Sequence, residues 1–173
     1  MYNPGAKRND QPINQISTAG NNALGASHGI VYIQTLPVGM GIEAAGERSS
    51  TQQPVFYTYG YNFSADGITT DGNHMYAQFF WPDGSLYQLA TAVYRIGQPG
   101  APIRTIVGTG CTVSSNGGAL GYGLAIFKKY IFEGCLDTGG SAGSVLVYDS
   151  TTSGMQAPIT QVPGGDTGVA IGP

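Results

Sequence analysis

Apolar and polar residues alternate with a period of two along much of the chain, which predicts β-strands. In the stretch VFYTYGYNF every second residue is apolar or aromatic, so one face carries Val55, Tyr57, Tyr59, Tyr61 and Phe63. Runs rich in β-branched, aromatic or alternating apolar residues predict further strands at 29–36, 103–108, 118–132 and 144–149. We expect the strand over 118–132 to bend or break at a glycine, and a helix over 125–132 is the alternative.

The stretch FFWPDGSLYQ, residues 79–88, predicts a β-hairpin. Pro82-Asp83-Gly84 suits a type I turn, because proline presets φ and glycine accepts a positive φ. A turn at this point sets Phe79 opposite Tyr87. One face then carries Met75, Ala77, Phe79, Trp81, Tyr87, Leu89 and Val93. The other face is half apolar, so we expect a second layer or another subunit to cover it.

Short strands, Gly/Pro turns and the lack of a long helical pattern predict an all-β fold. The expected architecture is an antiparallel β-sandwich or a small, jelly-roll-like β-barrel. Residues 1–28 and 151–173 keep neither period and are rich in proline and glycine, which predicts extended N- and C-terminal arms around one domain at 29–150. Within that domain, residues 37–54 predict a glycine-rich loop.

The composition excludes several classes of function. Charged residues make up 10% of the chain, whereas about 25% is usual for soluble domains. The basic pairs Lys7-Arg8 and Lys128-Lys129 do not form the cluster that nucleic acid requires, so we expect no nucleic-acid partner. The chain shows no signal peptide, and no stretch is apolar enough for a transmembrane helix, so no membrane partner is expected.

Cys111 and Cys135 permit one disulfide. Two free, buried thiols are the interpretation we favour, because free cysteine packs as a small hydrophobic residue.

Ionisable residues that could converge on a reaction are scarce, and we predict no catalytic, cofactor or metal site. His28 and His74 lack the spacing of a zinc site. Several aspartates lie in turn signatures, where their side chains bond the local backbone: Asp66, Asp71 and Asp83. Residues 139–143 match the G-x-S-x-G motif of hydrolases, but a strand pattern and no histidine follow them. The chain is therefore expected not to be an enzyme.

The stretch IRTIVGTGCTVSSNGGALGYGLA, residues 103–125, resembles the "VVGGTG…A.GYA" stretch of dirigent proteins and allene oxide cyclases. It lacks one glycine of GGTG, and its second half follows at a longer spacing. The resemblance implies a small β-barrel cyclase or ligand-binding protein with an apolar cavity for a small molecule. In that alternative the cavity would be lined by aromatic residues: Tyr57, Tyr59, Tyr61, Phe79 and Trp81.

The favoured hypothesis is a structural, self-assembling protein, because low charge and apolar surfaces on both faces of strands suit contacts between subunits. A virion (phage capsid, decoration or tail) or an extracellular lattice is the expected setting. The expected partners are copies of the chain or other structural subunits, without a cofactor. A secreted carbohydrate-binding module is the third hypothesis. The residues expected at contacts between chains are Tyr2, Ile13, Ile16, Tyr76, Phe80, Leu86 and Ile159.

Overall fold

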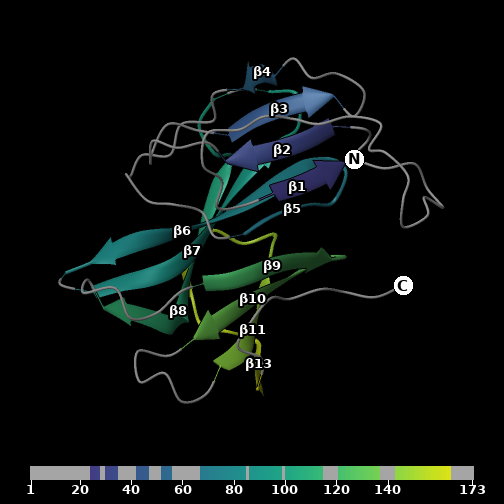
Figure 1. Ribbon diagram of the computed structural model, residues 1–173. Helices are drawn as coiled ribbons and strands as arrows, with labels where there is room; N and C mark the ends of the chain where they lie inside the picture. The colour runs from purple at the N-terminus through teal and green to yellow at the C-terminus, as the bar shows by residue number, and fades with distance from the viewer. Residues whose placement is uncertain are drawn as a thin grey trace, which may run out of the picture.

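The fold is all-β, as the alternation of apolar residues predicted. A computed structural model describes residues 24–27, 30–34, 42–46, 52–55, 67–84, 86–98, 100–114, 121–136 and 143–164 (Figure 1). Every regular element in these ranges is a β-strand. The strands form three open hydrogen-bonded sheets, and the described sheets do not close into a barrel. The architecture is therefore sandwich-like.

The N-terminal sheet is a meander of antiparallel strands in the order β1-β2-β3-β4. Its strands are β1 (Leu24–Ser27), β2 (Ile30–Gln34), β3 (Ile42–Gly46) and β4 (Gln52–Val55). The prediction of a loop over 37–54 was wrong at β3 and β4. The sequence IEAAG…QQPV lacks an apolar alternation and becomes strand because β3 pairs along β2 and β4 pairs along β3. β1 lies within the predicted N-terminal arm.

The central sheet has the order β12-β8-β7-β6-β5. Its strands are β5 (Ile68–Thr70), β6 (His74–Asp83), β7 (Leu86–Arg95), β8 (Arg104–Ser114) and β12 (Gly154–Gln156). Neighbouring strands are antiparallel except for β12, which runs parallel to β8. This sheet contains the predicted hairpin and most of the buried side chains.

The C-terminal sheet is antiparallel and has the order β13-β11-β10-β9. Its strands are β9 (Gly121–Phe127), β10 (Tyr130–Leu136), β11 (Gly143–Asp149) and β13 (Thr160–Pro163). The predicted strand over 118–132 breaks at Lys128-Lys129 and not at a glycine, and the helical alternative is wrong. Lys128 has a φ of 56°, which reverses the chain between Phe127 and Tyr130.

The central sheet is covered on both faces (Figure 1). One face packs on the C-terminal sheet through the sandwich core: Tyr76, Leu89, Val93, Ile106, Cys111, Leu124, Ile131, Cys135, Leu146 and Tyr148. The other face forms a second cluster that Ile30 and Tyr32 of the N-terminal sheet join: Ile68, Met75, Ala77, Phe79, Ala90, Ala92, Tyr94 and Val107. The expectation that a second layer covers the half-apolar face is confirmed.

The register of the β6–β7 hairpin differs from the predicted one. Phe79 lies opposite Ala90 and not Tyr87, and Asp83 pairs with Leu86, so the chain reverses between these last two residues. Gly84 has a φ of 63°, which suits the first position of a two-residue hairpin turn. The register shifts by three residues. Because that number is odd, Leu89 and Val93 face the sandwich core instead of sharing the face of Phe79.

Cys111 and Cys135 form a disulfide with a Cα–Cα distance of 5.9 Å, so the prediction of free thiols was wrong. The bond joins β8 of the central sheet to β10 of the C-terminal sheet. Sequence spacing could not reveal this, because the two strands meet only when the sheets pack face to face. The disulfide is thus a covalent tie across the sandwich core.

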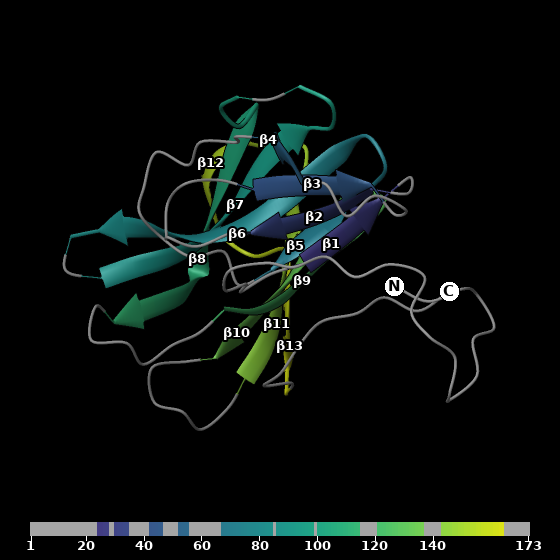
Figure 2. The same cartoon turned by 45° about the horizontal axis from the view of Figure 1, so that its top comes forward.

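Residues 151–164 of the predicted C-terminal arm belong in part to the sheets. Strand β12 extends the edge of the central sheet, and β13 extends the edge of the C-terminal sheet. In Figure 2 the yellow C-terminal segment runs from β12 to β13, and it thereby connects the edges of both layers. A hydrogen bond holds the connection between β12 and β13 against β11: the Ile159 amide donates to the Val147 carbonyl at 2.8 Å.

Candidate functional site

The residues predicted at contacts between chains are distributed over core and surface. Tyr2, Ile13 and Ile16 lie outside the described residues. Tyr76 is only 2% exposed within the sandwich core, and Phe80 is partly buried against that core. Leu86 and Ile159 are exposed. Leu86 begins β7, whereas Ile159 lies between β12 and β13, and only Ile159 has exposed apolar neighbours on its own segment.

Of the residues proposed to line a cavity, only some lie in the part of the chain that the structure describes. Tyr57, Tyr59 and Tyr61 lie outside the described residues. Phe79 and Trp81 pack edge to face, with ring centroids 6.2 Å apart, on the face of the central sheet that meets Ile30 and Tyr32. These two rings therefore fill a core between layers, and the barrel that the alternative requires is not formed by the described strands.

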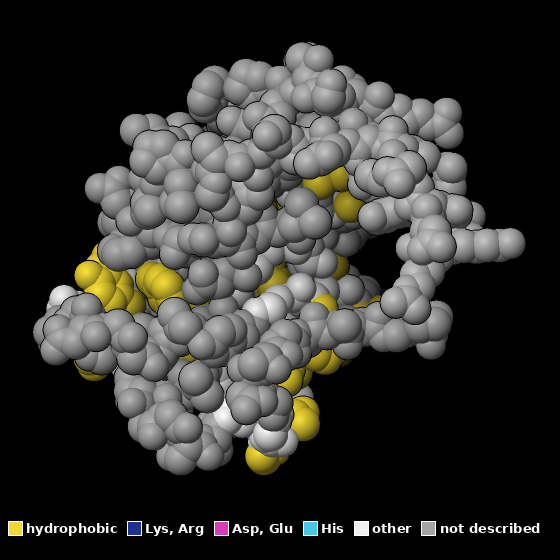
Figure 3. All heavy atoms as spheres, in the orientation of Figure 1, with side chains coloured by type: hydrophobic (Ala, Val, Ile, Leu, Met, Phe, Trp, Pro, Cys, Tyr) yellow, Lys and Arg dark blue, Asp and Glu magenta, His cyan; other side chains and the backbone are white. Residues whose placement is uncertain are grey.

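Among the described residues, the three large apolar side chains with the highest exposed fractions lie on one segment, residues 154–163, which we name the C-terminal edge. Met155 is 60% exposed, Ile159 57% and Val162 52%. The sequence from Ser150 to Gly164 contains no charged residue. Figure 3 shows hydrophobic side chains at the surface in the lower part of the molecule, where β13 lies. An uncharged apolar surface at the boundary of two sheets is the kind of surface that a protein partner covers.

The backbone of β13 is poorly suited to pairing with another strand. The Gly164 amide donates to the Gly143 carbonyl at 2.9 Å, so that pair is hydrogen-bonded. Hydrogen-bonded and non-hydrogen-bonded pairs alternate, which directs the nitrogen of Pro163, opposite Ser144, away from β11. Proline has no N–H there, so the free edge lacks a donor. Contacts at this edge would therefore depend mainly on side chains.

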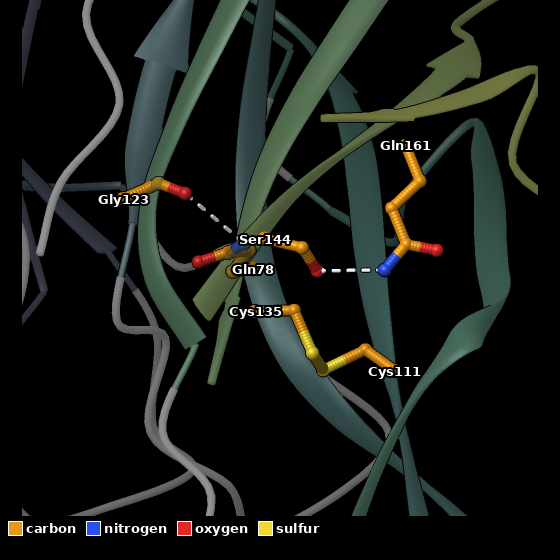
Figure 4. Close-up of a disulfide and its surroundings, with 6 residues drawn as sticks. All are labelled: Gln78, Cys111, Gly123, Cys135, Ser144 and Gln161. Atoms are coloured by element: carbon orange, nitrogen blue, oxygen red, sulfur yellow. Dashed lines mark hydrogen bonds between the residues drawn. A yellow bond between two sulfur atoms is a disulfide. The ribbon is translucent and has the colours of Figure 1, made fainter. Parts of the chain in front are cut away.

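A half-open pocket of about 360 Å³ lies beside the disulfide (Figure 4). It is lined by Gly110, Cys111, Thr112, Cys135, Gly143, Ser144, Gln161 and Pro163. The Gln161 amide Nε2 donates to Ser144 Oγ at 3.1 Å, so two polar groups of the pocket lining bond each other. The lining contains no ionisable group that could donate or accept a proton in a reaction.

A cluster of polar groups surrounds Asp71, before β6. Its Oδ1 accepts from the amides of Asn73 and His74 at 2.9 and 2.7 Å. Its Oδ2 accepts from Tyr76 Oη at 2.8 Å and pairs with His74 Nδ1 at 3.1 Å. Partial burial raises the pKa of Asp71, but the four hydrogen bonds outweigh it and lower the pKa from 3.8.

The contacts with Asp71 give both His74 and Tyr76 a structural role. Burial, together with the hydrogen bond to Asp71, raises the pKa of Tyr76 to about 12, so its hydroxyl stays protonated as a donor. The ring of His74 packs against Tyr76 and pairs with the same carboxylate. The predicted turn role of Asp71 is confirmed, and the arrangement holds the entry to β6 in place.

The other residues considered with Asp71 lie apart from this cluster. Asp83 accepts from Gln88 Nε2 at 3.2 Å, while Asp66 and His28 lie outside the described residues.

Glu133 is a site that the sequence-based interpretation missed. It lies on β10 with its side chain 0% exposed between the two sheets, where Thr91 Oγ1 donates to Oε1. Burial raises the pKa of Glu133 to about 7, and the hydrogen bond from Thr91 partly opposes this shift. One signal was present: in YIFEGCL, Glu133 shares the period-two face of Ile131 and Cys135, which places a carboxyl on an inward face.

Within the described ranges no three His, Cys, Asp or Glu side chains lie close enough together to hold a metal ion. The same ranges contain no helix that is long and apolar enough to cross a membrane.

Comparisons with known proteins bear on the fold alone. No family model matches the chain, and no curated protein matches it in sequence. Its structure is similar to the crystal structure of the computationally designed Ika4 protein, with a TM-score of 0.57 and 15% identity. The match covers 95% of this chain and 88% of that one. At this identity the similarity concerns the arrangement of strands and implies no activity.

Proposed function

We propose that the chain is a structural subunit that assembles with copies of itself through the C-terminal edge. The observation that carries the proposal is the exposure of Met155, Ile159 and Val162 on one uncharged segment. Threonine, serine and glutamine side chains surround these three residues along the sequence. An apolar centre with a polar, uncharged rim has the composition of an interface between subunits.

A second copy of the chain is the partner that this surface suits best. The segment itself carries no charge that would select an oppositely charged partner. A two-fold axis brings the same patch of each subunit together, and an uncharged apolar patch is complementary to itself. Because Pro163 removes a donor from the free edge of β13, we expect side-chain packing to close the contact instead of open-ended strand pairing.

The setting we propose is a virion or an extracellular lattice. The disulfide between Cys111 and Cys135 supports it, because disulfides persist on particle surfaces and outside cells and are rare in reducing compartments. The two other hypotheses receive less support. The described sheets are open, which disfavours a barrel cyclase, and Trp81 packs on a buried cluster, which disfavours an exposed sugar-stacking platform.

Light scattering of the full chain over a range of concentrations tests the proposal. We expect a native mass well above the 17.9 kDa of one chain. A variant with Met155→Ser, Ile159→Thr and Val162→Thr should return to the mass of a monomer while keeping its β-sheet circular dichroism spectrum.

A matched control carries Ile103→Thr and Phe127→Ser, which remove apolar side chains of similar exposure, 47% and 49%, outside the C-terminal edge. This control should assemble like the unmodified chain. A monomer at every concentration would contradict self-assembly. Loss of assembly in both variants would show that the C-terminal edge is not the contact.

A further inference from the structure

Glu133 occupies the middle of the sandwich core. Directly across the C-terminal sheet it pairs with Leu124 on β9 and with Leu146 on β11, and both side chains are buried. Thr91 on β7 faces it from the central sheet. An ionised carboxylate in such surroundings lacks the solvation of water, so burial favours the protonated form.

The groups facing Glu133 do not neutralise a negative charge. Oε1 accepts a hydrogen bond from Thr91, and Oε2 has no hydrogen-bond partner among the described residues. The ionisable group that interacts electrostatically with Glu133 is Tyr148 on β11. The pKa of Tyr148 is raised first by burial and then by the charge of Glu133. Gln78 on β6, the cross-strand neighbour of Thr91, is uncharged.

Three basic side chains of the described residues interact with groups other than Glu133. Lys129 lies 3.3 Å from Asp149 at the surface, His74 pairs with Asp71, and Arg104 acts electrostatically on Tyr76. No ion pair to Glu133 occurs in the described ranges. Ionisation of Glu133 would therefore leave an uncompensated charge between two sheets.

We propose that Glu133 is a buried proton switch: the protonated carboxyl lets the C-terminal sheet pack on the central sheet, and ionisation loosens that packing. Strand β10 pairs with β11, and β11 carries β13. Loosening this sheet would disturb the C-terminal edge, so assembly should weaken as the pH rises; this last step rests on the proposed function.

The direction follows from proton linkage. A carboxyl whose pKa is higher in the folded than in the unfolded chain contributes its full stability below the unfolded value, and that contribution is lost as the pH rises through the folded value. For Glu133 the window runs from 4.5 to about 7. Across these two and a half pH units the folding equilibrium should weaken roughly 300-fold. The Cys111–Cys135 tie keeps the sheets together, so we expect local loosening and not separation of the layers.

The first test measures the ionisation itself. The side-chain carboxyl carbon of Glu133 is followed by carbon-13 NMR from pH 4 to 9, and Glu133→Gln identifies its signal. We expect a midpoint near neutrality. Thr91→Val should raise that midpoint further, because it removes the hydrogen bond that stabilises the charged form. A midpoint below pH 5 in the unmodified chain would overturn the proposal.

The second test measures the consequence. Urea unfolding at pH 5 and pH 8 should show the loss of stability in the unmodified chain and a much smaller difference in Glu133→Gln. Equal pH dependence in both chains would overturn the switch. The same comparison is repeated in the variant with Met155→Ser, Ile159→Thr and Val162→Thr. A pH effect in that variant supports the switch even if self-assembly proves wrong, so the two proposals fail separately.

Discussion

The ring of Tyr148 lies against the backbone of Gly108, and this contact sets the distance between β11 and β8 across the sandwich core. A Cβ added at position 108 would come within 2.5 Å of Tyr148 Oη and 2.6 Å of its Cζ. The ring itself is fully buried. Glycine is needed here because of this close approach and not because of a positive φ.

Gly108→Ala should therefore destabilise the fold by about 1–3 kcal/mol, because the added methyl group would overlap the buried ring and force it or the strand to shift. Chemical denaturation measures the effect. Thr109→Ala, at the exposed neighbouring position, is the control and should change the free energy of unfolding by less than about 0.5 kcal/mol. An unchanged stability in Gly108→Ala would show that the ring does not pack as described.

Removing the disulfide should lower stability substantially. Cys111 and Cys135 are separated by 24 positions, and the tie limits the freedom of the unfolded chain. Replacing both cysteines with alanine should lower the free energy of unfolding by about 3 kcal/mol. A reducing agent should lower the stability of the unmodified chain by a similar amount and leave the double variant unchanged. Insensitivity of the unmodified chain to reductant would contradict the bond.

The turn between β9 and β10 should be improved by glycine at its first position. Lys128 has a φ of 56°, which is strained for a side chain with a Cβ and favourable for glycine. Lys128→Gly should raise the free energy of unfolding by about 0.5–1 kcal/mol in thermal or chemical denaturation. Lys129→Gly, next to it, should lower stability, because that position has no positive φ and its side chain pairs with Asp149.

Acid should weaken the fold partly through Asp71. Its pKa is lowered from 3.8, so its contribution is present above that value and is lost as the pH falls below it. Asp71→Ala should lower the free energy of unfolding by about 1–3 kcal/mol at pH 7, because four donor groups lose their acceptor and one of them, the Tyr76 hydroxyl, is partly buried. The variant should also lose less stability than the unmodified chain between pH 5 and pH 2.

Asp83→Ala is the comparison for this prediction. Asp83 is exposed and accepts one side-chain hydrogen bond, from Gln88, so its replacement should cost clearly less than that of Asp71. Equal losses in the two variants would indicate that the four hydrogen bonds to Asp71 do not stabilise the entry to β6.

The all-β class and the position of most central and C-terminal strands could be predicted from the amino-acid sequence. Alternating side chains in β6, β7 and β11 reflect a local rule, because neighbouring residues of a strand face opposite sides of the sheet. The turn role of Asp71 followed from equally local chemistry. At the candidate site, sequence reasoning picked out Ile159 but did not reveal its exposed neighbours Met155 and Val162.

Features that depend on contacts between residues far apart in the sequence became visible only in the folded structure. The β6–β7 register shifted because two turns were compatible with PDGS, and pairing along the whole hairpin selected one. Strands β3 and β4 exist through pairing, without an apolar pattern of their own. Cys111 meets Cys135, and Glu133 becomes buried against Thr91, only because two sheets stack face to face. The alternation of apolar and polar residues predicts which face of a sheet a side chain occupies. Only the packing of the sheets determines which residues that side chain contacts.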